Sequence, residues 1–296
     1  MCSSDLANGG AEAALFESFR QGMRDLGYVA GRNVVYEERW AEGKLDRMPA
    51  FAAELVAAKP DVLFVAGTPG VIALKKATTT IPIVMTNVGE PVGNGLVSNL
   101  ARPGGNVTGN TSIVGEMTGK RLELLKRTVP RLSRVAVLGH PEDPIFGVQW
   151  QHAQAVAKTL KIEVFAVEIH SIGEIDAAFE TIVKRRADGI LRMGDPLIGP
   201  GRIRTSELAL KHRLPTMVTR LDEVEAGLLM SYGPERLELF RQAAVYVDKI
   251  IKGTKPGDLP VEQPTKFELA VNMKTAKALG IKIPDPIIVQ ATKVVR

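Results

Sequence analysis

The sequence predicts an α/β protein of two lobes, each built on a parallel β-sheet, with several strands joining the lobes. Short, unbroken apolar runs alternate with helix-length segments, and such runs are typical of strands covered on both faces. This alternation occurs once before Gly115 and again after it, and the pattern changes after Gly227. A chain of 296 residues is long enough for two domains of ordinary size.

The first series is organised around one strand–helix–strand segment. Val62–Ala66 and Ile81–Met85 are apolar runs, and Gly70–Ala77 between them has the length of a helix. The crossover of such a unit is almost always right-handed, which places the loops Gly67–Pro69 and Thr86–Pro91 at the same carboxyl edge of the sheet. Ligands of open α/β sheets bind at that edge.

Other elements of the first lobe are predicted from the spacing of apolar residues and from the glycine and proline residues that end helices and strands. Phe16, Phe19, Met23 and Leu26 recur at helical spacing before Gly27. We expect helices at 11–27 and 92–101 and strands at 34–40 and 106–111.

The N-terminus differs from the rest of the lobe because Met1–Gly10 contains no apolar run. In a doubly wound lobe the first strand is central, so a gap is expected between the strands at 34–40 and 62–66. We therefore expect that an export signal and the first strand are missing from this chain, and that it is poorly stable as a result.

The second series begins at Gly115 and the returning segment at Asp222. We divide the chain into an N-terminal lobe (1–112), a C-terminal lobe (113–221) and a segment (222–296) packed mainly on the N-terminal lobe and the hinge. The expected helices are 115–129, 146–160, 175–182, 202–212, 237–251, 275–279 and 287–295. The expected strands are 134–138, 163–167, 189–193, 215–219, 228–232 and 267–271.

Composition and motifs exclude several classes of function. The basic clusters are short and aromatic residues are only 5%, which argues against nucleic-acid binding, and no apolar run could span a bilayer. A single Cys2 excludes an intrachain disulfide and a cysteine-rich metal site. No metal-ligand spacing, nucleophile elbow or nucleotide-binding glycine loop is present, so we expect no catalytic residue, metal or cofactor. His140 and His170 fall near strand ends, where a functional role remains open.

Several predicted strands end in small, polar or proline-containing loops. Each loop leads to a helix N-terminus, whose free N–H groups suit a carboxylate, although such loops can also be ordinary strand-to-helix turns. The candidate ligand-binding residues are Gly67, Thr68, Pro69, Asn87, Gly89, Glu90, Pro91, Pro141, Asp143, Asp195 and Tyr232.

Long segments of this chain resemble bacterial ABC-transporter substrate-binding proteins, in the subfamily with aromatic amino acid-binding members. They are GYVAGRNVVYEERWAEGKLDRMP, AGTPGVIALKKATTTIPIVMTNVGEPVGNGLVSNLARPGGNVTG, EAGLLMSYGPE and LPVEQPTKFELAVNMKTAKALG. The resemblance implies a type I periplasmic-binding fold with two Rossmann-like lobes, three hinge crossings and a ligand captured in the interlobe cleft. It also implies a monomer that is periplasmic, or extracellular and membrane-associated, and that delivers its small-molecule ligand to an ABC permease and ATPase.

The resemblance suggests an amino acid or a related organic acid as the ligand. Thr68, which can also cap its helix, would hold the carboxylate with backbone N–H groups. Glu90 or Asp195 would meet the ammonium group, and Tyr232 would pack against the side chain or belong to the core. Two alternatives are a cytoplasmic ligand sensor and an enzyme, whose carboxylates would come from Glu90, Asp195, Glu142 and Asp143.

Such a protein should close like a hinge on its ligand. The expected hinge segments are 110–114, 219–222 and the residues near Val271.

Overall fold

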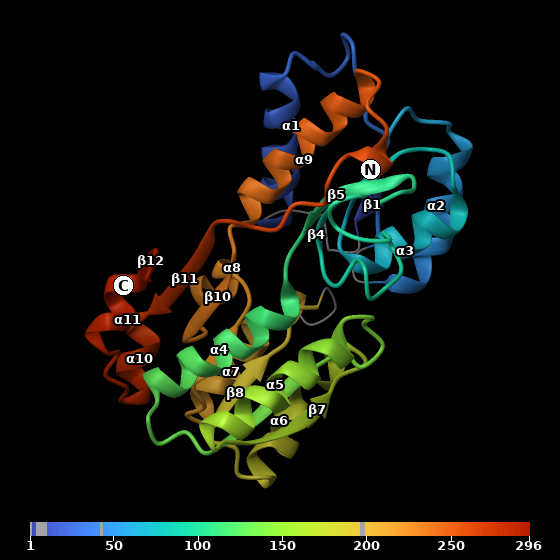
Figure 1. Ribbon diagram of the computed structural model, residues 1–296. Helices are drawn as coiled ribbons and strands as arrows, with labels where there is room; N and C mark the ends of the chain where they lie inside the picture. Colours follow the sequence, from blue (N-terminus) through green and yellow to red (C-terminus); the bar gives the residue numbers. More distant parts are fainter. Residues whose placement is uncertain (1, 4–10, 42–43, 196–198) are drawn as a thin grey trace. The chain divides into compact units, whose positions relative to one another are not determined.

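The computed structural model describes residues 2–3, 11–41, 44–195 and 199–296, and it divides into two compact units (Figure 1). Unit 1 consists of Met1–Ile113 and Pro234–Lys266, and unit 2 consists of Val114–Gly233 and Phe267–Arg296. The chain thus passes between the units three times. The segment 222–296 is shared between both units instead of packing mainly on the first, and the expected hinge at 219–222 lies inside unit 2.

Unit 1 contains a five-stranded sheet in the order β2-β1-β3-β4-β5. Its strands, parallel in every pair of the sheet, are β1 (Cys2–Ser3), β2 (Arg39–Trp40), β3 (Leu63–Ala66), β4 (Ile83–Val88) and β5 (Val107–Thr111). The parallel sheet predicted from the apolar runs is therefore confirmed.

The gap expected in the middle of this sheet is not present. Cys2 pairs with Arg39 and Val65, and Ser3 pairs with Trp40 and Ala66, so β1 lies between β2 and β3, where the gap was expected. The sequence prediction was wrong here because a strand of two residues is too short to leave an apolar run. Residues 1 and 4–10 of the segment lie outside the described residues.

Aromatic side chains form the core on one face of the unit 1 sheet. The helices are α1 (Ala11–Asp25), α2 (Met48–Ala57), α3 (Thr68–Ala77) and α9 (Arg236–Ile251). Phe19 stacks on Phe64 with ring centroids 4.0 Å apart, and Phe16 meets Phe240 edge-on at 5.3 Å. Because Phe240 is on α9, the returning helix completes the first unit and lies beside α1 (Figure 1). Burying such side chains contributes about 1.5–3 kcal/mol each.

Two predicted elements of unit 1 were wrong. Residues 92–101 form turns, in which Leu96 N–H donates to Pro91 O at 2.8 Å and Lys75 donates to Leu96 O at 2.8 Å. Within 34–40 only Arg39–Trp40 is a strand, and Val35 is 81% exposed, so its apolar side chain does not pack into the sheet as the pattern suggested.

Unit 2 contains a seven-stranded sheet in the order β12-β11-β10-β9-β8-β6-β7. The strands are β6 (Arg134–Gly139), β7 (Glu163–Glu168), β8 (Gly189–Arg192), β9 (Thr216–Val218), β10 (Met230–Pro234), β11 (Phe267–Asn272) and β12 (Lys293–Val295). Val294 pairs in parallel with Val271. The predicted helix at 287–295 therefore ends early, and its last residues form an edge strand.

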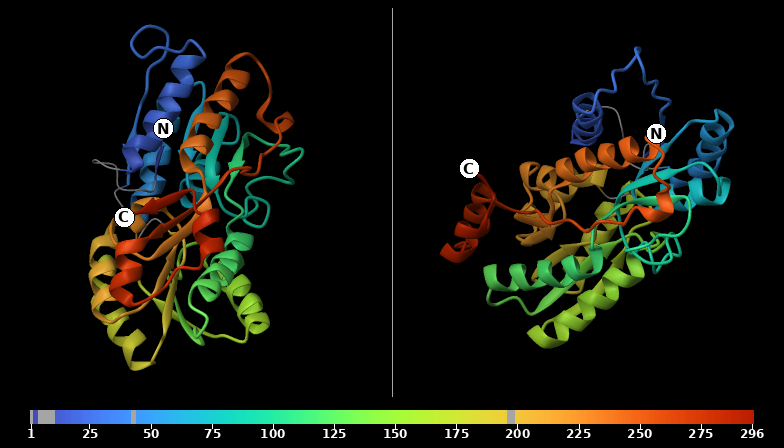
Figure 2. Two further views of the ribbon diagram at one scale, coloured as in Figure 1. Left: turned by 90° about the vertical axis from the view of Figure 1, so that its left-hand side faces the viewer. Right: turned by 45° about the horizontal axis from the view of Figure 1, so that its top comes forward.

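Helices cover both faces of this sheet, which explains its continuous apolar strands. They are α4 (Val114–Thr128), α5 (Phe146–Leu160), α6 (Ile175–Lys184), α7 (Arg202–Lys211), α8 (Leu221–Glu225), α10 (Met273–Leu279) and α11 (Asp285–Gln290). Helices α4 and α5 lie side by side (Figure 2). A Cβ at Gly119 would stand 2.8 Å from Val156 Cγ2, so glycine permits this close packing.

Candidate functional site

Each sheet has a point where the strand order reverses, and the loops at its carboxyl edge are the usual place for a ligand. In unit 1 the reversal is at β1, which lies between β2 and β3, and in unit 2 it is at β6, which lies between β7 and β8. In unit 1, Thr68 begins α3 just after β3, Asn87 lies near the end of β4, and Glu90 follows β4. In unit 2, the loops after β6 and β8 carry Asp143 and Asp195. Each unit therefore places its predicted site residues at one sheet edge.

In unit 1, Thr68 joins the two neighbouring loops. Its hydroxyl donates to Gly89 O at 3.3 Å and accepts from Gly89 N–H at 3.1 Å, and the residue is 3% exposed. The helix cap is Gly67, with φ of 81° and no side-chain hydrogen bond, so Thr68 does not cap α3 as expected. The hydroxyl that was predicted to face a ligand already satisfies a backbone N–H and a backbone carbonyl.

Asn110, which sequence reasoning did not select, fixes the end of β4. Its Oδ1 accepts from the Thr86 hydroxyl and from the Asn87 N–H, each at 3.0 Å. Its Nδ2 donates to Leu239 O of α9 at 2.9 Å. A completely buried amide thus connects the carboxyl edge of the sheet to the returning helix.

Two residues at and just after the end of β4 have a left-handed backbone. Asn87 has φ of 53° and Glu90 has φ of 49°. Asparagine tolerates this region, whereas for glutamate it costs about 1–2 kcal/mol. Residues held in such conformations gather at functional sites, where the surrounding structure determines them.

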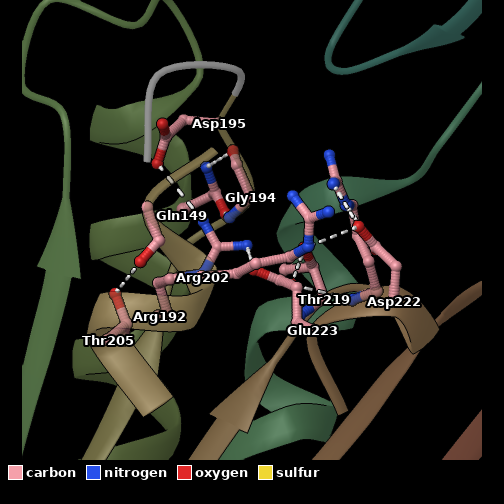
Figure 3. A network of polar contacts seen from close by, with 11 residues as sticks. Gln149, Arg192, Gly194, Asp195, Arg202, Thr205, Thr219, Asp222 and Glu223 are labelled. Carbon is pink, nitrogen blue, oxygen red and sulfur yellow. Dashed lines mark hydrogen bonds and ion pairs between the residues drawn. The ribbon is translucent and has the colours of Figure 1, made fainter. Parts of the chain in front are cut away.

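In unit 2, a chain of buried charges follows β8 (Figure 3). Arg192, the last residue of β8, pairs with Glu223 of α8, and both side chains are at most 2% exposed. Arg192 Nη1 also lies 3.9 Å from Asp195 Oδ2, whose side chain is 1% exposed. One guanidinium group is therefore shared by two buried carboxylates.

Glu223 also holds the loop that follows β9. Its Oε2 accepts from the N–H groups of Thr219 at 3.3 Å and Arg220 at 3.1 Å. Arg220 in turn donates to both carboxylate oxygens of Asp222, at 2.9 and 2.7 Å. Through Glu223, the loops after β8 and β9 are joined by buried charged groups (Figure 3).

Gln149 of α5 fixes the loop after β8 from another direction (Figure 3). Its Nε2 donates to Gly194 O at 3.1 Å, and its Oε1 accepts from Gly194 N–H at 3.0 Å. This two-bond clamp stands next to Asp195, so Asp195 follows a rigidly held backbone.

Arg121 of α4 lies beside the middle of β10. Its Nε donates to Tyr232 O at 2.6 Å, and the residue is 3% exposed. Burial, together with the charge of Arg192, lowers the pKa of Arg121 to about 10. The Tyr232 ring packs on Phe267 with ring centroids 5.9 Å apart, and it also contacts the hydrophobic core of unit 2. This position agrees with the predicted core role of Tyr232. Its contact with a ligand stays a prediction.

The loop after β6 contains Pro141 and Asp143. Asp143 is 4% exposed, and its Oδ1 accepts from Ile145 N–H at 3.0 Å, a contact within the turn that starts α5. In the same loop region, Glu142 lies 3.3 Å from His140 Nε2 and 3.5 Å from His170 Nδ1. Both histidines thus face one carboxylate at the carboxyl edge.

Sequence reasoning missed the three buried residues Arg121, Arg192 and Glu223. A signal was present for Arg192, which follows the apolar run 189–191 at the end of a predicted strand. Arg121 follows Lys120 and Glu223 follows Asp222, so their immediate neighbours did not mark them as buried. Charged side chains are almost never fully buried unless they are paired, so such positions mark either a structural ion network or a site.

Within the described residues, no group of three or more His, Cys, Asp or Glu side chains could hold a metal ion. Nor is any helix of the described ranges long and apolar enough to cross a membrane.

Comparison with known proteins gives a consistent result over nearly the whole chain. The sequence profile of the ABC transporter substrate binding protein family matches residues 6–295. A tyrosine-binding protein of Clostridioides difficile (strain R20291) is 28% identical over 266 residues, which are 90% of this chain and 76% of that protein.

Three solved structures are similar over 99% of this chain and 98% of their own. A conserved domain protein of Vibrio cholerae has a TM-score of 0.92 at 28% identity. An ABC domain from Streptococcus pneumonia in complex with L-Trp has a TM-score of 0.92 at 24% identity. The ligand-free, open structure of a substrate binding protein with adhesive properties from Clostridium difficile has a TM-score of 0.73 at 26% identity.

Proposed function

Since this chain belongs to the family of ABC transporter substrate-binding proteins, we propose that it is the extracytoplasmic receptor of an ABC importer for an amino acid or a related small organic acid. The family match along residues 6–295 carries the receptor role. The ligand class is supported by the tyrosine-binding relative and by the similar structure that holds L-Trp.

The charges of unit 2 suit a ligand of this class. Asp195 lies at the carboxyl edge, 3.9 Å from Arg192, whose main partner is Glu223. A desolvated cation such as a ligand ammonium group needs an anionic partner, and a carboxylate at this edge is one. We therefore keep Asp195 as the proposed partner of the ammonium group and Tyr232 as a surface for the ligand side chain.

The remaining candidate residues have supporting roles in this proposal. Gly67, Thr68 and Gly89 shape the unit 1 edge, with Pro69 in the first turn of α3. Asn87 near the end of β4 and Glu90 after it have left-handed backbones, and Pro91, Pro141 and Asp143 belong to turns. Capture of one ligand by both units stays a prediction.

The proposed partners are an ABC permease and its ATPase, and the proposed location is periplasmic or extracellular at the membrane. We propose a monomer without cofactor. A receptor of this kind changes no bond in its ligand.

The function is tested by identifying small molecules that leave the purified protein on denaturation, using mass spectrometry. Each molecule found, together with the common amino acids, is then measured by calorimetry and in a turnover assay. We expect one amino acid or organic acid to bind with micromolar or tighter affinity and to be recovered unchanged. Conversion of the molecule to a product would refute the receptor role, and binding of sugars alone would refute the ligand class.

A further inference from the structure

Arg121 lies near the carboxyl edge of unit 2, beside β10 and the residue that follows β9. Its Nε donates to O of Tyr232, the middle residue of β10. A Cβ built on Gly233 would stand 3.6 Å from Arg121 Nη2 and 2.6 Å from Thr219 O, just after β9. The guanidinium group therefore adjoins the loop that Glu223 organises.

Among the described residues, Arg121 forms no ion pair, although it is 3% exposed. Its Nη1 is buried without a hydrogen-bond partner. The carboxylate whose charge favours it most is Glu223, but Glu223 is already paired with Arg192 and bonded to two backbone N–H groups. Arg192 repels Arg121, which adds to the cost of its burial.

A buried cation without an anionic partner is strongly unfavourable, and buried charges in proteins are normally paired. The backbone carbonyl of Tyr232 supplies a single acceptor for a group that has five donors. A planar guanidinium matches a carboxylate with two parallel hydrogen bonds, which makes arginine well suited to recognise one.

We propose that Arg121 binds the carboxylate of the ligand. The inference rests on the proposed function, and it differs from the prediction that Thr68 holds this group, because the Thr68 hydroxyl is already bonded to Gly89. With Asp195 for the ammonium group, unit 2 provides one partner for each charge of an amino acid.

The test uses L-tryptophan, tryptamine (which lacks the carboxylate) and indole-3-propionate (which lacks the ammonium group) in calorimetry with the full chain. In Arg121→Met, we expect L-tryptophan and indole-3-propionate to bind about tenfold to a hundredfold more weakly, the scale of a charge-assisted hydrogen bond. Tryptamine should bind the variant and the wild type equally, since it has no group for Arg121 to hold. Arg121→Lys should recover part of the lost affinity.

Arg213→Met is the matched control. Arg213 also donates to a backbone carbonyl, that of Leu279 at 3.2 Å, but it precedes β9 and so lies at the opposite edge of the sheet. Its replacement should change no affinity.

The outcomes separate the inference from the function on which it rests. If Arg121→Met loses the same affinity for L-tryptophan as for tryptamine, the role of Arg121 is structural only and the inference is overturned. The inference is also overturned if the wild type binds L-tryptophan and tryptamine equally well. If the wild type binds neither L-tryptophan nor L-tyrosine nor any other amino acid, the proposed ligand class fails and the inference with it. If Arg121→Met does not fold, the inference is tested by the affinities of Arg121→Lys and of the wild type, each measured for L-tryptophan and for tryptamine.

Discussion

The carboxyl edges of the two units are held together by different chemistry. In unit 1 the carboxyl edge is held by hydrogen bonds between neutral groups: Thr68 at the start of α3 bonds to Gly89 after β4, and Asn110 of β5 bonds to Asn87 of β4. In unit 2 the loops after β8 and β9 are joined by Arg192 and Glu223, a buried ion pair.

The neutral hydrogen bonds of unit 1 determine the shape of its edge, whereas the ion pair of unit 2 gives its edge buried charges. Neutral hydrogen bonds contribute about 0.5–1.5 kcal/mol each and fix the path of a loop, as the strained Glu90 backbone shows. Buried ions interact over longer distances in a medium of low dielectric constant. Removing one partner of a buried ion pair therefore lowers the stability of the protein much more than removing one neutral hydrogen bond. Of the two edges, unit 2 is therefore the better place to recognise a charged ligand.

The largest effect is expected from removing the charge of Glu223. Glu223→Gln leaves Arg192 buried without its main partner, so the free energy of unfolding should fall by about 3–5 kcal/mol. Urea denaturation followed by circular dichroism measures the change. A fall below about 1 kcal/mol would mean that the pair is not buried as described.

The control for this prediction is Glu207→Gln. Glu207 pairs with Arg204 at 3.0 Å, but both side chains are at least half exposed, so the loss should stay under about 1 kcal/mol. The double variant Arg192→Met with Glu223→Gln should regain only part of the stability. Glutamine still offers an acceptor to the N–H groups of Thr219 and Arg220, but the buried charges of Asp195 and Arg121 remain.

The sequence predicted most strands of the two sheets because strands buried on both faces appear in the sequence as unbroken apolar runs. Unbroken runs such as Val135–Leu138 gave β6, and Phe146–Leu160 was predicted to the residue. Very short strands were missed, namely β1 with two residues and β12 with three. Two or three residues are too few to show an alternating or continuous apolar pattern, so backbone pairing is needed to recognise them.

The site was predicted only at the level of loops. The carboxyl-edge rule located Thr68, Glu90 and Asp195, since it needs only the order of strands and helices. Arg192 and Glu223 are 31 positions apart, and no local pattern says that their side chains meet. Only the fold reveals that Asp195 shares a guanidinium group with Glu223.

The second effect concerns ligand binding at the charged edge. Asp195→Asn should weaken amino acid binding by about 1.5–3 kcal/mol, the usual scale of a hydrogen bond to a charged group. Calorimetry with the ligand found by mass spectrometry measures it. Asp176→Asn, whose exposed carboxylate pairs with Arg204, is the control and should bind normally. Unchanged affinity in Asp195→Asn would remove Asp195 from the site.

The third effect tests the neutral edge. Thr68→Val removes the hydroxyl that serves both the N–H and the carbonyl of Gly89, so unfolding should become about 1–2 kcal/mol easier. Thr68→Ser keeps the hydroxyl and should lose less. Both are measured by urea denaturation, and a larger loss in Thr68→Ser than in Thr68→Val would assign the role of Thr68 to its methyl group instead.

The smallest effect concerns the strained backbone of unit 1. With φ of 49° at position 90, Glu90→Gly should be about 1 kcal/mol more stable than Glu90→Ala, because glycine alone avoids the Cβ clash of the left-handed region. Glu116, exposed in the first turn of α4, is the matched control, and there alanine should be the more stable of the two by up to about 1 kcal/mol. Urea denaturation of the four variants gives both differences. If alanine is also preferred at position 90, the loop after β4 relaxes easily, and the unit 1 edge is not held in shape by its neutral hydrogen bonds.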